Sequence, residues 1–181
     1  MAKVSLSGSE KSIEDIWSWY EDQKEALRDF RNKIINVLMT APHNVNNKFV
    51  TLTLDEINDY FDYSEEELEH LVSFDLISAT EGILRTDFYK KVFDKDKSAL
   101  GREFRNIYKQ KVNKISLEED IIESWKNINI ATKSEFSSLL GLLNYRHWLA
   151  HGRYWNLHKK GRRYSVEETY GIAESIFDFV I

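Results

Sequence analysis

The residues from Asn144 to Trp155 read NYRHWLAHGRYW and gather the side chains of this chain that are best suited to chemistry. A Leu-rich stretch leads directly into them. A neutral histidine can take up a proton near pH 7, and an arginine can hold the oxygens of a phosphate. Such groups could cleave RNA without a metal. The 2′-hydroxyl of a nucleotide attacks its own 3′ phosphate once a base removes the proton and a cation holds the phosphate.

Metal binding competes for the same segment. His147 and His151 are four residues apart, so on a helix they share a face and could ligate Zn²⁺. Trp148 stands where the helical metalloprotease pattern needs a glutamate, and only His158 is a candidate third ligand. The two nearby arginines also oppose a dication. We therefore predict no metal and no cofactor.

Binding of RNA without cleavage is a further alternative. From Asn144 to Tyr164 the chain has no acidic residue, although the whole protein has a net charge of -5. The cations of such a patch would neutralise phosphates, and its aromatic rings would stack on bases. The predicted RNA-binding residues are Arg153, Tyr154, Trp155, Lys159, Lys160, Arg162 and Arg163. A purely structural role also stays open at this point, with cations reaching solvent from a helix end and aromatic rings packing in the core.

The run from Arg146 to His151 resembles the Arg-x4-6-His signature of HEPN domains (higher eukaryotes and prokaryotes nucleotide-binding). A polar residue often follows the arginine in that family, and here it is His147. A small residue commonly precedes the histidine, and here it is Ala150. The resemblance implies an all-helical up-and-down bundle, typically a homodimer, and in many members a metal-independent ribonuclease of toxin–antitoxin or anti-phage systems. By resemblance, Arg146 and His151 form the catalytic pair and His147 supports them.

One position departs from a subgroup of that family. HEPN toxins paired with a nucleotidyltransferase antitoxin often carry a tyrosine two residues after the motif histidine, where this chain has Arg153. Regulation by nucleotide transfer to that tyrosine is therefore not predicted.

Helix geometry limits how the implied pair can be arranged. Five residues on a straight α-helix turn the chain by roughly 140°, so Arg146 and His151 would not share a face. Either the helix breaks near residues 150–152, where Gly152 is well placed to end it with a positive φ, or a second subunit completes the site. We expect a homodimer with a composite site across a two-fold axis, in which one histidine is the base and the other the acid.

The elements that position this segment are predicted to be helices. The 181 residues include only 7 glycines and 1 proline, which argues against an all-β fold with its many tight turns. Apolar residues at three- and four-residue steps predict helices over residues 10–39, 100–112, 116–128 and 134–150, with one last helix beyond. Ser116 and Ser165 each precede a glutamate by three residues, which is typical of an N-cap.

The residues from 43 to 97 are predicted to form a small acidic insert that can contain strands. The sequence KFVTLTL at 48–54 alternates weakly and predicts a short extended piece. Thr53 would cap a short helix, and Ser64 would start the next one as part of a capping box. Gly82 would mark a turn, after which the chain could pair with the extended piece. A winged-helix module would also fit, but the acidity of this segment is wrong for contact with DNA.

Composition and charge set the wider limits. The chain has no cysteine, which excludes disulfides and thiolate metal sites. No run reaches the ~20 apolar residues of a membrane span, and the first residues lack the apolar stretch of a secretory signal. We therefore expect a cytoplasmic protein without membrane contact. Residues 1–99 carry 12 basic and 20 acidic residues, whereas residues 100–181 carry 13 and 10.

The sequence thus predicts an all-α, HEPN-like bundle over 10–42 and 98–181, with a flexible tail over 1–9 and the insert over 43–97. The expected activity is metal-independent endoribonuclease, with RNA as substrate and an antitoxin or regulatory protein as a further partner. One alternative is a catalytically inactive HEPN-like module that binds RNA or nucleotides or regulates another protein. A protein adaptor whose acidic insert binds a basic partner is a different class that also stays open.

Overall fold

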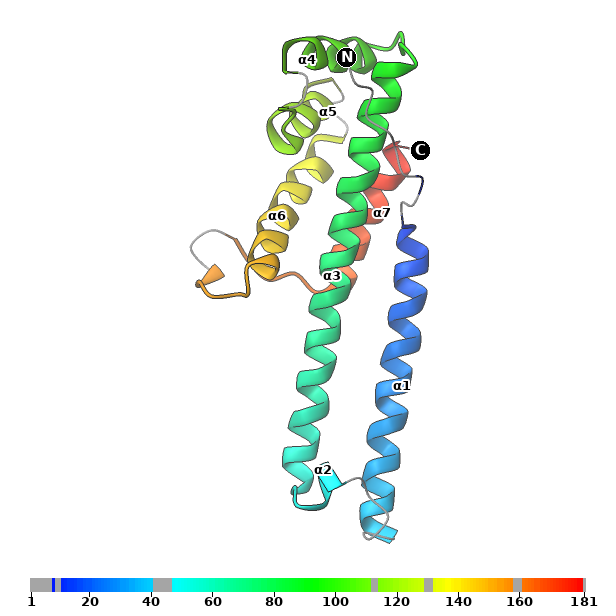
Figure 1. The fold of residues 1–181 in the computed structure, drawn as a ribbon, viewed down its shortest axis with the longest axis vertical. Coiled ribbons are helices and arrows are strands. Elements are labelled where there is room, and N and C mark those ends of the chain that lie inside the picture. Colours follow the sequence, from blue (N-terminus) through cyan, green and yellow to red (C-terminus); the bar gives the residue numbers. More distant parts are fainter. Residues whose placement is uncertain are drawn as a thin grey trace. The chain divides into compact units, whose positions relative to one another are not determined.

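The computed structural model describes residue 8 and residues 11–40, 47–111, 114–128, 132–157 and 161–180. Every regular element in these ranges is helical, which confirms the predicted all-α class (Figure 1). Within the same ranges, no helix combines the length and the apolar character that a membrane span requires. The elements in chain order are α1 (Ile13–Thr40), α2 (Asn47–Val50), α3 (Leu54–Phe93), α4 (Ala99–Lys111), the π-helical segment η2 (Leu117–Ile122), α5 (Glu123–Ile128), α6 (Lys133–Ala150) and α7 (Val166–Val180).

The chain divides into two compact units. One is Glu14–Val72, and the other is Ser73–Ile181 together with Met1–Ile13. Helix α3 contributes residues to both units. The residues of the predicted insert at 43–97 are therefore shared between the two units, and the role expected for them stays a prediction.

The Glu14–Val72 unit is held by an aromatic cluster between α1, α2 and the beginning of α3. Phe49 of α2 and Phe61 of α3 are buried and stack with their ring centroids 5.9 Å apart. Arg31 of α1 donates hydrogen bonds to Asn58 at 2.7 Å and to Asp62 at 2.9 Å on α3. The extended piece predicted near residue 50 is wrong. The chain forms the one-turn helix α2 there, because this turn buries Phe49 in the cluster.

The start of α3 confirms the predicted cap at Thr53. Its hydroxyl accepts a hydrogen bond from the Glu56 N–H at 3.2 Å, and the Glu56 carboxylate accepts one from the Thr53 N–H at 2.8 Å. These two bonds form a reciprocal capping box. The Glu56 carboxylate accepts from the Thr53 N–H and also from the Thr53 hydroxyl at 2.9 Å, and these two bonds lower the pKa of Glu56 because they stabilise its charged form.

Two predicted interruptions inside α3 are wrong. The helix runs without a break through Ser64 and Gly82. The Ser64 hydroxyl donates to the Tyr60 carbonyl at 2.7 Å, as serines do within a helix, and caps nothing. The reason is that one apolar stripe continues along the whole helix. Its buried members are Ile57, Phe61, Leu68, Val72, Leu76, Ile77, Leu84, Phe88 and Val92. Burial of this stripe outweighs the roughly 1 kcal/mol that one helical glycine costs.

Replacing Gly82 by alanine tests the continuity of α3. A Cβ at this position meets nothing within 4 Å, so we expect the free energy of unfolding to rise by about 0.5–1 kcal/mol. Gly152→Ala is the matched contrast and should lower it, because Gly152 has a φ of +76°. Urea unfolding of both variants measures the difference. A loss of stability in Gly82→Ala would indicate a turn at this position.

The second unit contains the rest of α3, α4, η2, α5, α6 and α7. Figure 1 shows the chain running along α3, back through α5 and α6, and forward again in α7. A single core cluster joins these elements and includes Phe88 of α3, Phe104 of α4, Phe136 of α6 and Ile176 of α7. The helices expected in this half of the sequence are thus confirmed, and α6 begins and ends within one residue of its predicted limits.

Both predicted serine caps of this unit are confirmed, but the first one starts an unexpected element. The Ser116 hydroxyl accepts from the Glu119 N–H at 3.2 Å, and the Ser165 hydroxyl accepts from the Glu168 N–H at 3.1 Å. The six residues after Ser116 are π-helical rather than α-helical. Buried Asp120 explains this local winding, because its carboxylate accepts from the Ser116 N–H at 2.8 Å and from Lys111 at 2.6 Å.

Candidate functional site

Helix α6 positions the motif residues by burying one of its faces. It packs against α5 and α7, and Trp125 of α5 stacks on Phe136 with ring centroids 5.3 Å apart. Further along α6, Tyr145 and Trp148 are buried and stack on each other at 5.9 Å. The aromatic anchors fix the rotation of the helix. The polar residues that alternate with them, including His147, are consequently exposed.

The end of α6 is a Schellman turn. The Arg153 N–H donates to the Trp148 carbonyl at 3.1 Å, and the Gly152 N–H donates to the Leu149 carbonyl at 3.4 Å. Gly152 has a φ of +76°, as predicted, and Arg153 follows with a φ of 58°. The turn redirects the chain so that the residues after it fold back beside the last turn of the helix.

The turn brings the two motif histidines and an aromatic pair together. The rings of His147 and His151 lie 4.3 Å apart, and Trp155 lies 5.4 Å from His147. Trp148 fixes this loop, because its indole N–H donates to the Trp155 carbonyl at 2.9 Å. Tyr154 meets Trp155 edge-on at 4.7 Å and is 82% exposed. Two exposed imidazoles can exchange protons, and the open Tyr154 ring beyond Trp155 can stack a base.

Arg146 points to a different neighbour. Its Nη2 lies 3.9 Å from a carboxylate oxygen of Glu81 on α3, and its guanidinium lies over the ring of Phe74 at 5.4 Å. Its Nε is buried and has no hydrogen-bond partner among the described residues. The regular helix ends at Ala150, but within the described part of one chain this end brings His151 to His147 and not to Arg146.

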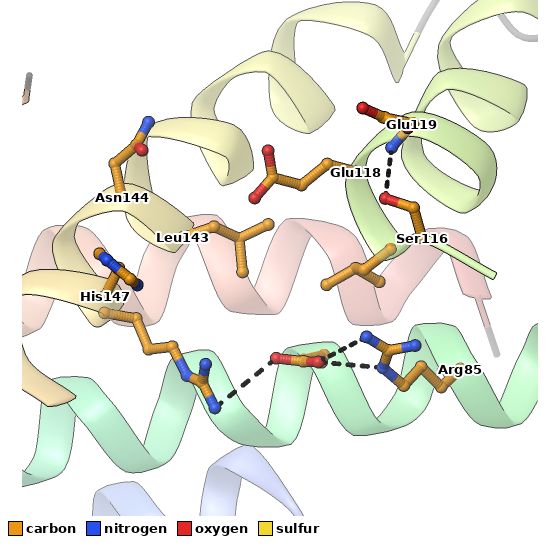
Figure 2. A pocket seen from close by; sticks show the side chains of 10 residues that line it. Arg85, Ser116, Glu118, Glu119, Leu143, Asn144 and His147 are labelled. Carbon is orange, nitrogen blue, oxygen red and sulfur yellow. Dashed lines mark hydrogen bonds and ion pairs between the residues drawn. The ribbon is translucent and has the colours of Figure 1, made fainter. Parts of the chain in front are cut away.

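A groove of about 600 Å³ lies beside Arg146, between α3, η2 and α6. Figure 2 shows Arg85 on α3, Ser116 at the N-cap of η2, Glu118 and Glu119 on η2, and Asn144 and His147 on α6 around it. The lining residues are Glu81, Arg85, Ser116, Leu117, Glu118, Glu119, Leu143, Asn144, Arg146 and His147. Three carboxylates thus face two guanidiniums, so these side chains give the groove no net positive charge.

The predicted RNA-binding residues fall into two groups. Arg153, Tyr154 and Trp155 lie in or just after the turn that holds the histidines.

Arg162 instead makes a two-pronged ion pair with Glu168, and its guanidinium lies over the Tyr164 ring at 4.0 Å. The ion pair lowers the pKa of Glu168. Arg163 lies over the ring of buried Trp148, with 5.3 Å from guanidinium to ring centroid. Lys159, Lys160 and His158 lie outside the described residues.

Four charged residues of the groove were not predicted as site residues from the sequence, namely Glu81, Arg85, Glu118 and Glu119. Glu81 and Arg85 are one turn apart on α3, a spacing at which opposite charges attract on any helix. That local signal gave no indication that the pair would meet Arg146, which lies 65 residues further along the chain than Glu81. Within the described ranges, no group of three or more His, Asp or Glu side chains gathers in a metal-binding arrangement.

Comparison of the chain with protein-family models, curated proteins and solved structures gave no match.

Proposed function

We propose that this protein is a metal-independent endoribonuclease that acts as a homodimer. The observation that carries the proposal is the pair of adjacent, exposed histidines at the end of α6, His147 and His151, next to Trp155, whose ring also meets exposed Tyr154. Acid–base cleavage needs groups that exchange protons near neutral pH, and histidine is the side chain whose ordinary pKa suits that task.

The proposed reaction uses the 2′-hydroxyl of the substrate as nucleophile. His151 of one subunit removes the proton of that hydroxyl, whose oxygen then attacks the adjacent phosphorus. The bond from phosphorus to the 5′ oxygen of the next nucleotide breaks, and His151 of the other subunit protonates that oxygen. The products are a 2′,3′-cyclic phosphate and a free 5′-hydroxyl. Arg146 stabilises the phosphoryl oxygens, and His147 orients the neighbouring His151.

The contacts of Arg146 support the dimer in this proposal. In one chain this arginine meets Glu81 on α3, whereas the ring of His151 meets His147. A second subunit can supply the missing arginine to each histidine across a two-fold axis. The resemblance of the motif to HEPN domains implies a toxin–antitoxin or anti-phage setting, and an antitoxin or regulatory protein is then a further partner.

A second candidate is a catalytically inactive module that binds RNA or nucleotides or regulates another protein. The same contact favours it, because an arginine next to a carboxylate is less available to a phosphate. In its RNA-binding form, the second candidate shares Arg153, Tyr154 and Trp155 as RNA contacts with the first and differs in that no bond is broken.

Incubation of the pure protein with labelled RNA in excess EDTA separates these candidates. We expect cleavage that leaves 2′,3′-cyclic phosphate ends, and none of an RNA with a 2′-deoxy nucleotide at the cleaved position, because the nucleophile is then absent. The mass of the active species should be that of a dimer at micromolar concentration. Intact RNA with a folded dimer would contradict cleavage, and an active monomer would contradict the composite site.

A further inference from the structure

We propose that Arg85 and Arg146 form a second phosphate subsite of the RNA site, and that Glu81 fills it in the free chain. Glu81 would then be an internal competitor that an RNA phosphate displaces. The inference rests on the proposed function for its ligand, since Arg146, which stabilises the cleaved phosphate, also holds the neighbouring phosphate together with Arg85. It adds two α3 residues that the motif does not contain.

The Glu81 carboxylate occupies the position between the two arginines that a phosphate would take. One carboxylate oxygen accepts a hydrogen bond from Nε of Arg85 at 2.9 Å and makes an ion pair with Nη2 of Arg85, also at 2.9 Å. The other oxygen lies 3.9 Å from Nη2 of Arg146. That distance is too long for a hydrogen bond and leaves only charge attraction. A single anionic group therefore bridges two guanidiniums, which is the arrangement that phosphate oxygens favour.

Arg146 is incompletely satisfied in this arrangement. Its Nε is buried, and no described residue accepts its proton. A buried donor without a partner costs free energy, so the arginine gains from any oxyanion that reaches both Nε and Nη2. Glu81 does not reach Nε from its position on α3, whereas a phosphate in the groove has several oxygens and is not tied to a helix.

The groove supplies the space and connects it with the histidines. It has a volume of about 600 Å³, and His147 lines it together with Arg85 and Arg146. The ring of the same His147 lies 4.3 Å from His151. An RNA strand with one phosphate at the histidines therefore has its neighbouring phosphate at the groove.

The acidic residues of the groove limit what it can hold. Figure 2 shows Glu118 of η2 extending over the groove toward α6, and Glu119 beside it. With Glu81 displaced, these two carboxylates still balance the two arginines. The groove therefore suits a single phosphate and not a run of them, and its occupancy depends on how firmly Glu81 competes.

Substitution of Glu81 by glutamine tests the competition directly. The probe is a short single-stranded 2′-O-methyl RNA, which cannot be cleaved, and the readout is fluorescence anisotropy over a range of salt concentrations. We expect Glu81→Gln to tighten binding about tenfold. The slope of log K against log salt should steepen by about 0.7, the value for one more neutralised phosphate on a single strand.

Glu118→Gln is the matched control, because it removes the same charge from the same groove and, among the described residues, Glu118 is not an ion-pair partner of Arg146. It should tighten binding by less than about threefold, through the general field alone. Equal effects of the two variants, or no effect of either, would overturn the subsite.

Arg85→Gln provides an independent variant should Glu81→Gln fail to fold. It should weaken binding and flatten the salt slope by about 0.7, whereas Arg102→Gln on the exposed face of α4 should leave both near wild type. If Arg85→Gln and Arg102→Gln are equal, the subsite is wrong. Failure of every variant to bind RNA also overturns it.

The cleavage assay separates this inference from the proposed function. Wild type that leaves RNA intact, with Glu81→Gln binding more tightly than Glu118→Gln, would refute the nuclease and keep the subsite. Cleavage by wild type, with Glu81→Gln and Glu118→Gln alike, would keep the nuclease and refute the subsite.

Discussion

Replacing His151 by alanine is expected to lower the rate of RNA cleavage by about 10²–10⁴-fold, because a positioned acid or base contributes that much to proton transfer. His151 is exposed at the end of α6, so the change removes no core packing. Its backbone N–H still donates to the His147 carbonyl at 3.2 Å, which keeps the helix end in place. The measurement is single-turnover cleavage in EDTA, with circular dichroism and mass to verify fold and dimer.

His147→Ala is the control that assigns the roles within the histidine pair. If His147 only orients its neighbour, the loss should be smaller, and His147→Asn should recover part of the rate because it retains a polar group. Equal losses would make both histidines direct participants in proton transfer. An unchanged rate in His151→Ala would remove it from the chemistry.

Truncation of Phe136 is expected to have the largest effect on stability. This side chain is fully buried in α6 and stacks on Trp125 at 5.3 Å, so it joins α5 to the helix that carries the site. Phe136→Ala should lower the free energy of unfolding by about 3–5 kcal/mol, from lost burial and the cavity left behind. Urea unfolding measures the loss as a lower midpoint.

Ser138→Ala, two residues further along α6, is the surface control. Ser138 is exposed, and its substitution should change stability by less than about 0.5 kcal/mol. A loss below about 1 kcal/mol in Phe136→Ala would mean that the core closes around the smaller side chain.

Helix starts were predictable wherever the signal was local and matched the apolar stripe. Thr53, Ser116 and Ser165 cap helices as their spacing indicates, because a hydroxyl and a glutamate three residues later satisfy the first free N–H groups. Ser64 has the same spacing and caps nothing. The stripe of α3 continues across it, and burial over many turns outweighs one local pattern.

The predicted extension near residue 50 failed for a related reason. Alternation over seven residues is a short pattern, and one ring decided its outcome, since α2 buries Phe49 against Phe61. The π-helical winding of η2 could likewise not be predicted from residue spacing. It accompanies a buried carboxylate, Asp120, that accepts hydrogen bonds from Ser116 and Lys111, both of which precede η2.

The candidate site also has a part that local sequence signals predict and a part that they do not. The motif at the end of α6 was visible because its members are adjacent, and Gly152 ends the helix as its residue type indicates. The neighbours of Arg146 were not visible, since Glu81 and Phe74 come from a helix distant in sequence. Pairings of this kind depend on how helices pack, which residue spacing does not encode.

The left-handed turn at the end of α6 has a consequence for how this chain can vary. Glycine occupies the first of its two positive-φ positions, but Arg153 occupies the second, at a cost of roughly 1–2 kcal/mol for a side chain in that conformation. Glycine or asparagine at 153 would favour folding and remove a cation from beside the histidines. At position 153, a substitution that stabilises the fold would therefore also weaken contact with RNA, so stability and RNA binding favour different residues there.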